Sequence, residues 1–125
     1  MKLKEKKTIF IVDDEEMIRE IALDMLDHMG YNVVLAKDGL DAVEVFTEKS
    51  SEIDLVLVDL IMPRMNGLVC YDRLKEIKPD IPIIVASGLG ELSKKQSILD
   101  KGAAGYLEKP YSLKALKEAF SKVFD

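Results

Sequence analysis

The chain has 125 residues and a formal net charge of −5, with 48% hydrophobic and 33% charged residues. These values fit one globular domain with a single core and exclude a disordered chain. The negative charge disfavours direct binding to nucleic acid, and no apolar run approaches the roughly 20 residues of a membrane-spanning helix or resembles a signal peptide core. We therefore expect a cytoplasmic module at residues 8–125, without membrane insertion, after a basic tail at residues 1–7.

The first two units each join a short strand to a helix. Residues 9–12 form an apolar, β-rich run that ends in Asp13 and Asp14. The next apolar residues recur at helical spacing until Gly30: Ile18, Ile21, Ala22, Met25, Leu26 and Met29. Residues 32–36 predict a second strand, and Asp38 predicts the cap of a second helix.

The third unit begins with a strand that is expected to be buried on both faces. Residues 55–58 form a continuous apolar run, which is typical of a strand covered on both faces of a parallel sheet. Asp59 follows this run, so we expect its carboxylate at the strand's exit. Pro63 prevents a regular continuation, and Asn66 with Gly67 predicts a turn and the start of a third helix.

Two further units complete the pattern. Residues 81–86 predict a fourth strand, followed by a helix over residues 91–100 that has few apolar residues. Residues 104–108 predict a fifth strand, and Ser112 caps the last helix. Five strand-then-helix repeats predict an α/β fold, with a doubly wound five-stranded parallel sheet and five helices on its two faces.

The carboxyl ends of parallel strands lie on one edge of a sheet, where open α/β folds bind their ligands. The residues that follow the five strands are Asp13, Asp14, Lys37, Asp38, Asp59, Ser87 and Lys109. Three carboxylates, those of Asp13, Asp14 and Asp59, suit Mg²⁺, which prefers hard oxygen ligands. With one lysine they leave a charge of about −2, which a divalent cation would neutralise before a phosphoryl group arrives. This combination favours magnesium-dependent phosphoryl transfer to a carboxylate nucleophile.

Each of these residues also has a simpler interpretation. Asp13 or Asp14 could be a helix N-cap, and Ser87 a turn residue. Lys109 could be a solvated charge, and Tyr106, within the predicted fifth strand, a half-buried aromatic. As a set on one edge of the sheet, they favour the functional interpretation.

Two other reactive residues are expected to be structural. Cys70, the single cysteine, excludes an internal disulfide, and its place in a helical pattern predicts core packing. His28 falls near the end of a predicted helix, which is typical of a surface histidine rather than a phosphodonor.

Four motifs in order resemble the receiver domain of two-component response regulators, the family that includes the bacterial chemotaxis regulator. They are residues 12–14 (VDD), Asp59 with Met62-Pro63 and Gly67, residues 86–88 (ASG), and residues 102–110 (GAAGYLEKP). The resemblance covers residues 8–124. It implies a flavodoxin-like strand order of 2-1-3-4-5.

The resemblance also implies a role for each matching residue. Asp59 would be the phosphoacceptor, and Asp13 and Asp14 would hold Mg²⁺, for which Mn²⁺ could substitute, together with Asp59 and the backbone carbonyl of Ile61. Ser87 would bind the phosphoryl group, Lys109 would pair with it, and Tyr106 would change rotamer as Ser87 moves. The Lys109-Pro110 peptide bond would be cis.

Two apolar positions are expected to tune the lifetime of the acyl phosphate. Ile61 lies two residues after Asp59, and Leu89 lies two residues after Ser87. The resemblance implies that these places influence hydrolysis. Because neither side chain can orient a water molecule, we expect slow self-dephosphorylation.

The sequence thus predicts a phosphorylation-activated switch in a phosphorelay, not a turnover enzyme. A sensor histidine kinase or a histidine phosphotransfer protein would donate the phosphoryl group. A protein target would read out the face formed by the fourth helix, fifth strand and fifth helix, since the chain ends just after that helix and leaves no room for an effector domain.

Three alternatives remain open. The chain could be the receiver module of a hybrid sensor histidine kinase. It could be a Mg²⁺-dependent phosphatase working through an aspartyl phosphate, although Ile61 stands where such an enzyme needs a general acid. A nucleotide-binding module is a third possibility, although a Gly-rich turn does not follow the first strand.

Overall fold

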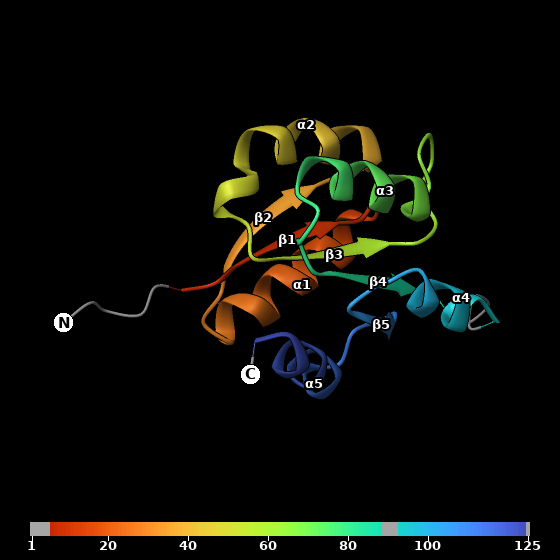
Figure 1. Ribbon diagram of the computed structural model, residues 1–125. Coiled ribbons are helices and arrows are strands. Elements are labelled where there is room, and N and C mark those ends of the chain that lie inside the picture. The colour runs from red at the N-terminus through yellow and green to blue at the C-terminus, as the bar shows by residue number, and fades with distance from the viewer. Residues whose placement is uncertain (1–5, 89–92, 125) are drawn as a thin grey trace.

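Five parallel strands form the central sheet of the computed structural model, which describes residues 6–88 and 93–124 (Figure 1). The strands are β1 (Thr8–Val12), β2 (Asn32–Ala36), β3 (Leu55–Asp59), β4 (Ile83–Ser87) and β5 (Gly105–Glu108). Their order is β2-β1-β3-β4-β5, and every neighbouring pair is parallel. The predicted doubly wound sheet and its strand order are confirmed.

The described residues contain five α-helices. They are α1 (Glu16–His28), α2 (Gly39–Lys49), α3 (Gly67–Ile77), α4 (Lys95–Asp100) and α5 (Leu113–Phe124), and the 3-10 helix η1 (Ser50–Glu52) lies between α2 and β3. Helices α2 and α3 cover one face of the sheet, and α1 and α5 cover the other (Figure 1). Among the described residues, no helix has the length and apolar character needed to cross a membrane.

The central strands are buried on both faces because their alternate side chains enter two separate cores. Phe10 of β1 packs with α2 and α3, where its ring stacks on that of Phe46 with centroids 6.0 Å apart. Its neighbours Ile9 and Ile11 enter the core beneath α1 and α5. This arrangement explains the continuous apolar runs, and it fixes the strand ends that carry the polar residues.

Helix N-caps set the positions of the loops at the carboxyl edge. Asp38 accepts a hydrogen bond from the Asp41 backbone N–H at 2.8 Å, so it caps α2 as predicted. Asn66 caps α3 through two backbone N–H groups at 3.0 Å, and Ser112 Oγ accepts from the Ala115 N–H at 3.0 Å. Helix α1 begins after Glu15 without a side-chain cap, so neither Asp13 nor Asp14 is its N-cap.

A few element boundaries differ from the predictions. Strand β4 begins at Ile83, two residues late, because Pro82 has no N–H to donate and joins the sheet only through its carbonyl. Ile21 was expected on the inner face of α1, but 36% of its surface is exposed at the border of the apolar stripe. The predicted start of the fourth helix, residue 91, lies outside the described residues.

Candidate functional site

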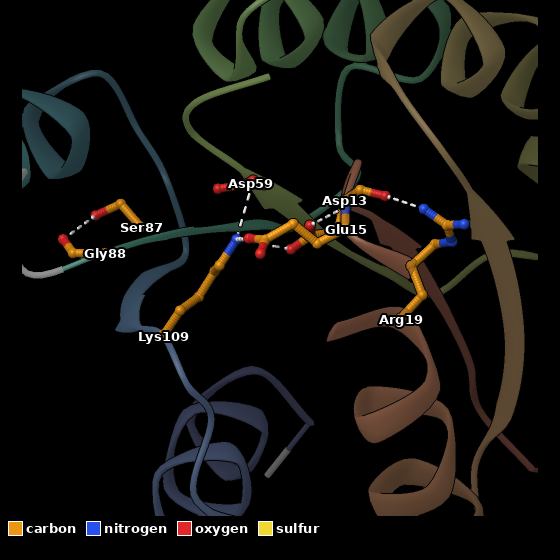
Figure 2. Close-up of polar contacts among 7 residues, drawn as sticks. All are labelled: Asp13, Glu15, Arg19, Asp59, Ser87, Gly88 and Lys109. Carbon is orange, nitrogen blue, oxygen red and sulfur yellow. Dashed lines mark hydrogen bonds and ion pairs between the residues drawn. The ribbon is translucent and has the colours of Figure 1, made fainter. Parts of the chain in front are cut away.

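Three strand ends bring their charged side chains together at the carboxyl edge of the sheet (Figure 2). Lys109, which follows β5, donates to Asp13 Oδ2 and to Asp59 Oδ2, each at 3.1 Å. Asp13 follows β1, and Asp59 is the last residue of β3. The Lys109-Pro110 peptide bond is cis, as the sequence resemblance implied. Residues up to 96 positions apart in the chain thus share one polar cluster.

The same edge brings three carboxylates within reach of one cation. Asp13, Asp14 and Asp59 each offer an oxygen atom, and these atoms all lie within 4.8 Å of one another. Asp13 and Asp59 are buried, whereas Asp14 is exposed to solvent. A set of carboxylate oxygens with one open side suits Mg²⁺, which keeps several of its waters. The donor set therefore fits the predicted metal.

Burial makes the negative charges of the cluster costly. It raises the pKa of Asp59 to about 6, and the charge of Asp13 adds to the shift. Burial also raises the pKa of Asp13. For Lys109, burial alone would lower the pKa, but hydrogen bonds to Glu15 and Asp59 and the charges of Asp13 and Asp59 outweigh it, so the pKa is raised. Lys109 stays positive, and the carboxylates remain short of compensating charge.

We expect Asp59→Asn to stabilise the metal-free protein by about 2 kcal/mol near neutral pH. The folded state holds the Asp59 proton up to about pH 6, whereas the unfolded chain releases it near the ordinary value of 3.8. The folded state therefore binds more protons in this window, so its free energy of unfolding falls as pH rises through it. A shift of about two units corresponds to about 3 kcal/mol, of which the lost pairing with Lys109 offsets part.

Urea unfolding with a metal chelator across pH measures this effect. The two stability curves should converge at acid pH, where Asp59 is protonated, and separate as the pH rises. Asp24→Asn, which removes an exposed carboxylate of α1, is the control and should leave the curve unchanged. A variant less stable than the wild type near neutral pH would contradict the expectation.

Ser87 and Tyr106 contact each other beside the acidic cluster. Ser87 ends β4 and is fully buried, and its hydroxyl forms a hydrogen bond with the hydroxyl of Tyr106 on β5. Ser87 Oγ also donates to the Gly88 carbonyl at 3.4 Å, a contact that is drawn in Figure 2. Since β3 lies between β1 and β4, Ser87 and Asp13 flank Asp59. The pair thus joins the edge of the site to strand β5.

The other predicted positions are Ile61, Leu89, Lys37 and Asp38. Ile61 follows Asp59 by two residues and is 53% exposed; burial raises the pKa of the Asp59 carboxyl, and the Ile61 backbone N–H lowers it. Leu89 lies outside the described residues. The expectation that Lys37 and Asp38 line the same site is wrong for Asp38, because its carboxylate caps α2 and pairs with Arg64 instead.

Sequence reasoning missed two residues that support the cluster. Glu15 Oε1 accepts from Lys109 at 3.0 Å, and Arg19 donates to the backbone carbonyl of Asp13 at 2.8 Å (Figure 2). Glu15 lies in the acidic run after the first strand, so the length of that run was an available signal. Arg19 lies one helical turn after Glu15, a spacing that brings its side chain back over the end of β1.

Comparisons with known proteins agree with this geometry. Residues 9–121 match the model of the response regulator receiver domain. Response regulator RR06 of Streptococcus pneumoniae serotype 2 (strain D39 / NCTC 7466) is 43% identical over 107 residues, which cover 84% of this chain and 47% of that protein. The autoinducer 1 sensor kinase/phosphatase LuxN of Vibrio harveyi is 41% identical over 111 residues, 88% of this chain and 13% of LuxN. The chain thus spans half or less of these relatives.

Solved structures give the same answer. A response regulator receiver domain protein from Clostridium thermocellum superposes with a TM-score of 0.88 at 29% identity, covering 94% of this chain and 93% of that one. CheY from Borrelia burgdorferi, in a complex with CheX, BeF3 and Mg, superposes with a TM-score of 0.89 at 28% identity, covering 95% and 90%. By sequence, fold and the residues at its carboxyl edge, the chain belongs to the response regulator receiver domain family.

Proposed function

We propose that this receiver domain is a phosphorylation-activated switch in which Asp59 accepts a phosphoryl group from a histidine of a partner protein. The observation that carries the proposal is the convergence on Asp59. Lys109 Nζ lies 3.1 Å from the carboxylates of both Asp59 and Asp13, and Asp14 completes a three-carboxylate cluster. A solubilising surface does not require two buried carboxylates paired with a half-buried lysine.

The chemistry needs an ionised carboxylate that water does not shield. Asp59 is 4% exposed, and with a pKa of about 6 it is mostly ionised near neutral pH. One of its oxygens attacks phosphorus, a P–O bond forms as the P–N bond to the donor imidazole breaks, and the electron pair returns to the imidazole nitrogen. Lys109 and the hydroxyl of Ser87 then offer donors to the phosphoryl oxygens.

The proposed metal ligands are the carboxylates of Asp13, Asp14 and Asp59 with the backbone carbonyl of Ile61. The site holds four carboxylates, those of Asp13, Asp14, Glu15 and Asp59, and the ammonium group of Lys109, so the cluster by itself repels an anionic donor. Mg²⁺, or Mn²⁺ in its place, would be held by the proposed ligands and would supply the positive charge that offsets this repulsion. The roles of the exposed Ile61 side chain and of Leu89 in slow dephosphorylation stay predictions.

We propose that Ser87 and Tyr106 transmit the effect of phosphorylation at Asp59 to the surface that binds the target. Their hydroxyls already contact each other, so movement of Ser87 toward a phosphoryl group removes a partner of Tyr106. Tyr106 lines a hollow of about 580 Å³ between α4, β5 and α5, which we propose as the surface for a protein target. The CheY relative in complex with CheX supports a protein partner.

The donor is proposed to be a sensor histidine kinase or a histidine phosphotransfer protein. The similarity to LuxN, a sensor kinase, supports a second candidate, in which this domain is the receiver module of a hybrid kinase. In both cases the domain is a signalling switch rather than a turnover enzyme. The cytoplasmic location, and the division into a basic segment at residues 1–7 and a module at residues 8–125, stay predictions.

Intact mass after incubation with acetyl phosphate and Mg²⁺ tests the proposal. We expect one alkali-labile phosphoryl adduct on the wild type and none on Asp59→Asn, because the amide is not a nucleophile. Asp72→Asn, an exposed carboxylate of α3, serves as the matched control and should be modified like the wild type. An equal adduct on Asp59→Asn would contradict the assignment, and sustained turnover of phosphate esters would favour a phosphatase.

A further inference from the structure

The loop between β3 and α3, residues 60–66, carries Ile61 and has an unusual backbone. Its ends are fixed by hydrogen bonds from the Leu60 N–H to the Ala86 carbonyl at 2.8 Å and from the Gly67 N–H to the Leu60 carbonyl at 2.7 Å. At its centre, the Met65 N–H donates to the Pro63 carbonyl at 2.7 Å.

That central hydrogen bond encloses Arg64, whose φ is 67°. A three-residue turn with a left-handed central residue is a rare and strained form of γ-turn. Such a backbone is costly for a residue with a Cβ, and it persists only where surrounding contacts hold it. The conformation of this loop therefore requires an explanation in its contacts.

Two contacts attach the loop to the start of α2. Arg64 Nη2 donates to Asp38 Oδ2, and Asp38 is 3% exposed and already fixed as the N-cap of α2. Met65, 8% exposed, packs on Gly39, where an added Cβ would lie 2.8 Å from the Met65 Cβ. The Arg64 side chain is 59% exposed, so packing of Arg64 in the protein interior does not hold it against the buried Asp38. Instead, the ion pair compensates the charge of the buried Asp38 carboxylate and holds the strained turn at Arg64 in place.

We propose that Arg64 and Asp38 are positioning residues, and that their ion pair holds the β3–α3 loop in the conformation that presents the Ile61 carbonyl to the cation site. The part of this inference that concerns cation affinity rests on the proposed function, because it needs Mg²⁺ to bind at Asp13, Asp14 and Asp59. The part that concerns the conformation of the loop does not rest on the proposed function.

Titration calorimetry with Mg²⁺ tests the first part on four proteins: the wild type, Arg64→Ala, Asp38→Asn and the double variant. Asparagine keeps the N-cap of α2 while removing the charge, so Asp38→Asn isolates the ion pair. We expect each single variant to raise the Kd for Mg²⁺ about tenfold, the low end for residues that support metal ligands. The double variant should lose no more than either single variant, since both act through one contact.

The signs of the two single effects separate positioning from long-range charge. If charge alone mattered, loss of the Arg64 cation would tighten Mg²⁺ binding, whereas loss of the Asp38 anion would weaken it. Positioning predicts weaker binding in both. Arg73→Ala, which removes an exposed cation of α3 outside the loop, is the matched control and should leave the Kd unchanged. Arg64→Lys, which keeps a cation, should recover part of the affinity.

Hydrogen exchange of the metal-free proteins tests the second part. The Met65 and Gly67 amides, both bonded within the loop region, should exchange severalfold faster in Arg64→Ala and in Asp38→Asn. If the titration shows that the wild type does not bind Mg²⁺, the proposed metal site is refuted; faster exchange in both variants would still support positioning of the loop. Unchanged exchange in both variants, or opposite shifts of their Kd values, would overturn the inference.

Discussion

Gly67→Ala is expected to destabilise the protein by about 3 kcal/mol and to weaken Mg²⁺ binding, although alanine is the better helix former. A Cβ at Gly67 would lie 2.3 Å from the backbone oxygen of Asp59 and 2.6 Å from the Cα of Leu60. Both are backbone atoms, so no side-chain rotation relieves the clash, and the end of β3 must move away from α3. Helix propensity favours alanine by at most about 1 kcal/mol, so the clash determines the sign.

Urea unfolding and Mg²⁺ titration together measure this prediction. Gly105→Ala is the matched control, because its Cβ would lie 3.5 Å from Ile84, an ordinary contact, and its stability should be nearly unchanged. The metal readout distinguishes a general loss of packing from a displaced phosphoacceptor: the displaced Asp59 should bind Mg²⁺ more weakly even where the variant is fully folded. Wild-type stability and affinity in Gly67→Ala would show that α3 can shift without moving β3.

The fold was predictable because its strands and helices have different apolar patterns. The run of residues 55–58 has no polar interruption, which suits a strand covered on both faces better than one with a solvated face, and all four residues are fully buried. The Asp38, Asn66 and Ser112 caps were likewise readable, since each places a short polar side chain before an apolar periodic segment. Strand β4 was misplaced by two residues because an apolar Ile81 beside Pro82 resembles a strand without pairing as one.

The site was predictable only where a strand's end fixes a side chain. Asp13, Asp59 and Lys109 converge because parallel strands share one edge. Contacts made between loops carry no such rule: Asp38 was expected at the site and instead pairs with Arg64. The direction of a side chain in a loop depends on the backbone conformation. A left-handed φ is usually signalled by a glycine in the sequence, but here it belongs to Arg64.

Lys109→Met is expected to cost the metal-free protein about 3 kcal/mol near neutral pH. The lysine side chain is 11% exposed and is the cation shared by Asp13, Glu15 and Asp59. Methionine retains the length and apolar character of the stem, so the loss reports the charge rather than a cavity. Removing one partner of a buried ion pair leaves uncompensated charge, and this makes such substitutions strongly destabilising.

The dependence of this loss on pH identifies its cause. Lys109 lowers the pKa of Asp59, so without it that pKa rises above its present value of about 6, and the folded variant holds its proton to higher pH than the unfolded chain does. For a raised pKa, stability is retained at acid pH and lost as the pH rises through the folded value. The deficit of Lys109→Met should therefore be small at acid pH and largest above neutrality.

A second substitution should reverse the deficit if buried charge causes it. The double variant Lys109→Met/Asp59→Asn removes one of the unpaired carboxylates and should recover much of the lost stability. Excess Mg²⁺, which binds only the folded cluster, should raise the stability of the variant by about 2.7 kcal/mol over that of the metal-free variant at a hundred times its Kd. Lys114→Met, an exposed lysine of α5, is the control and should show neither the loss nor the pH dependence. A deficit that changes neither with pH nor with Asp59→Asn would mean that Lys109 stabilises the fold by packing rather than by its charge.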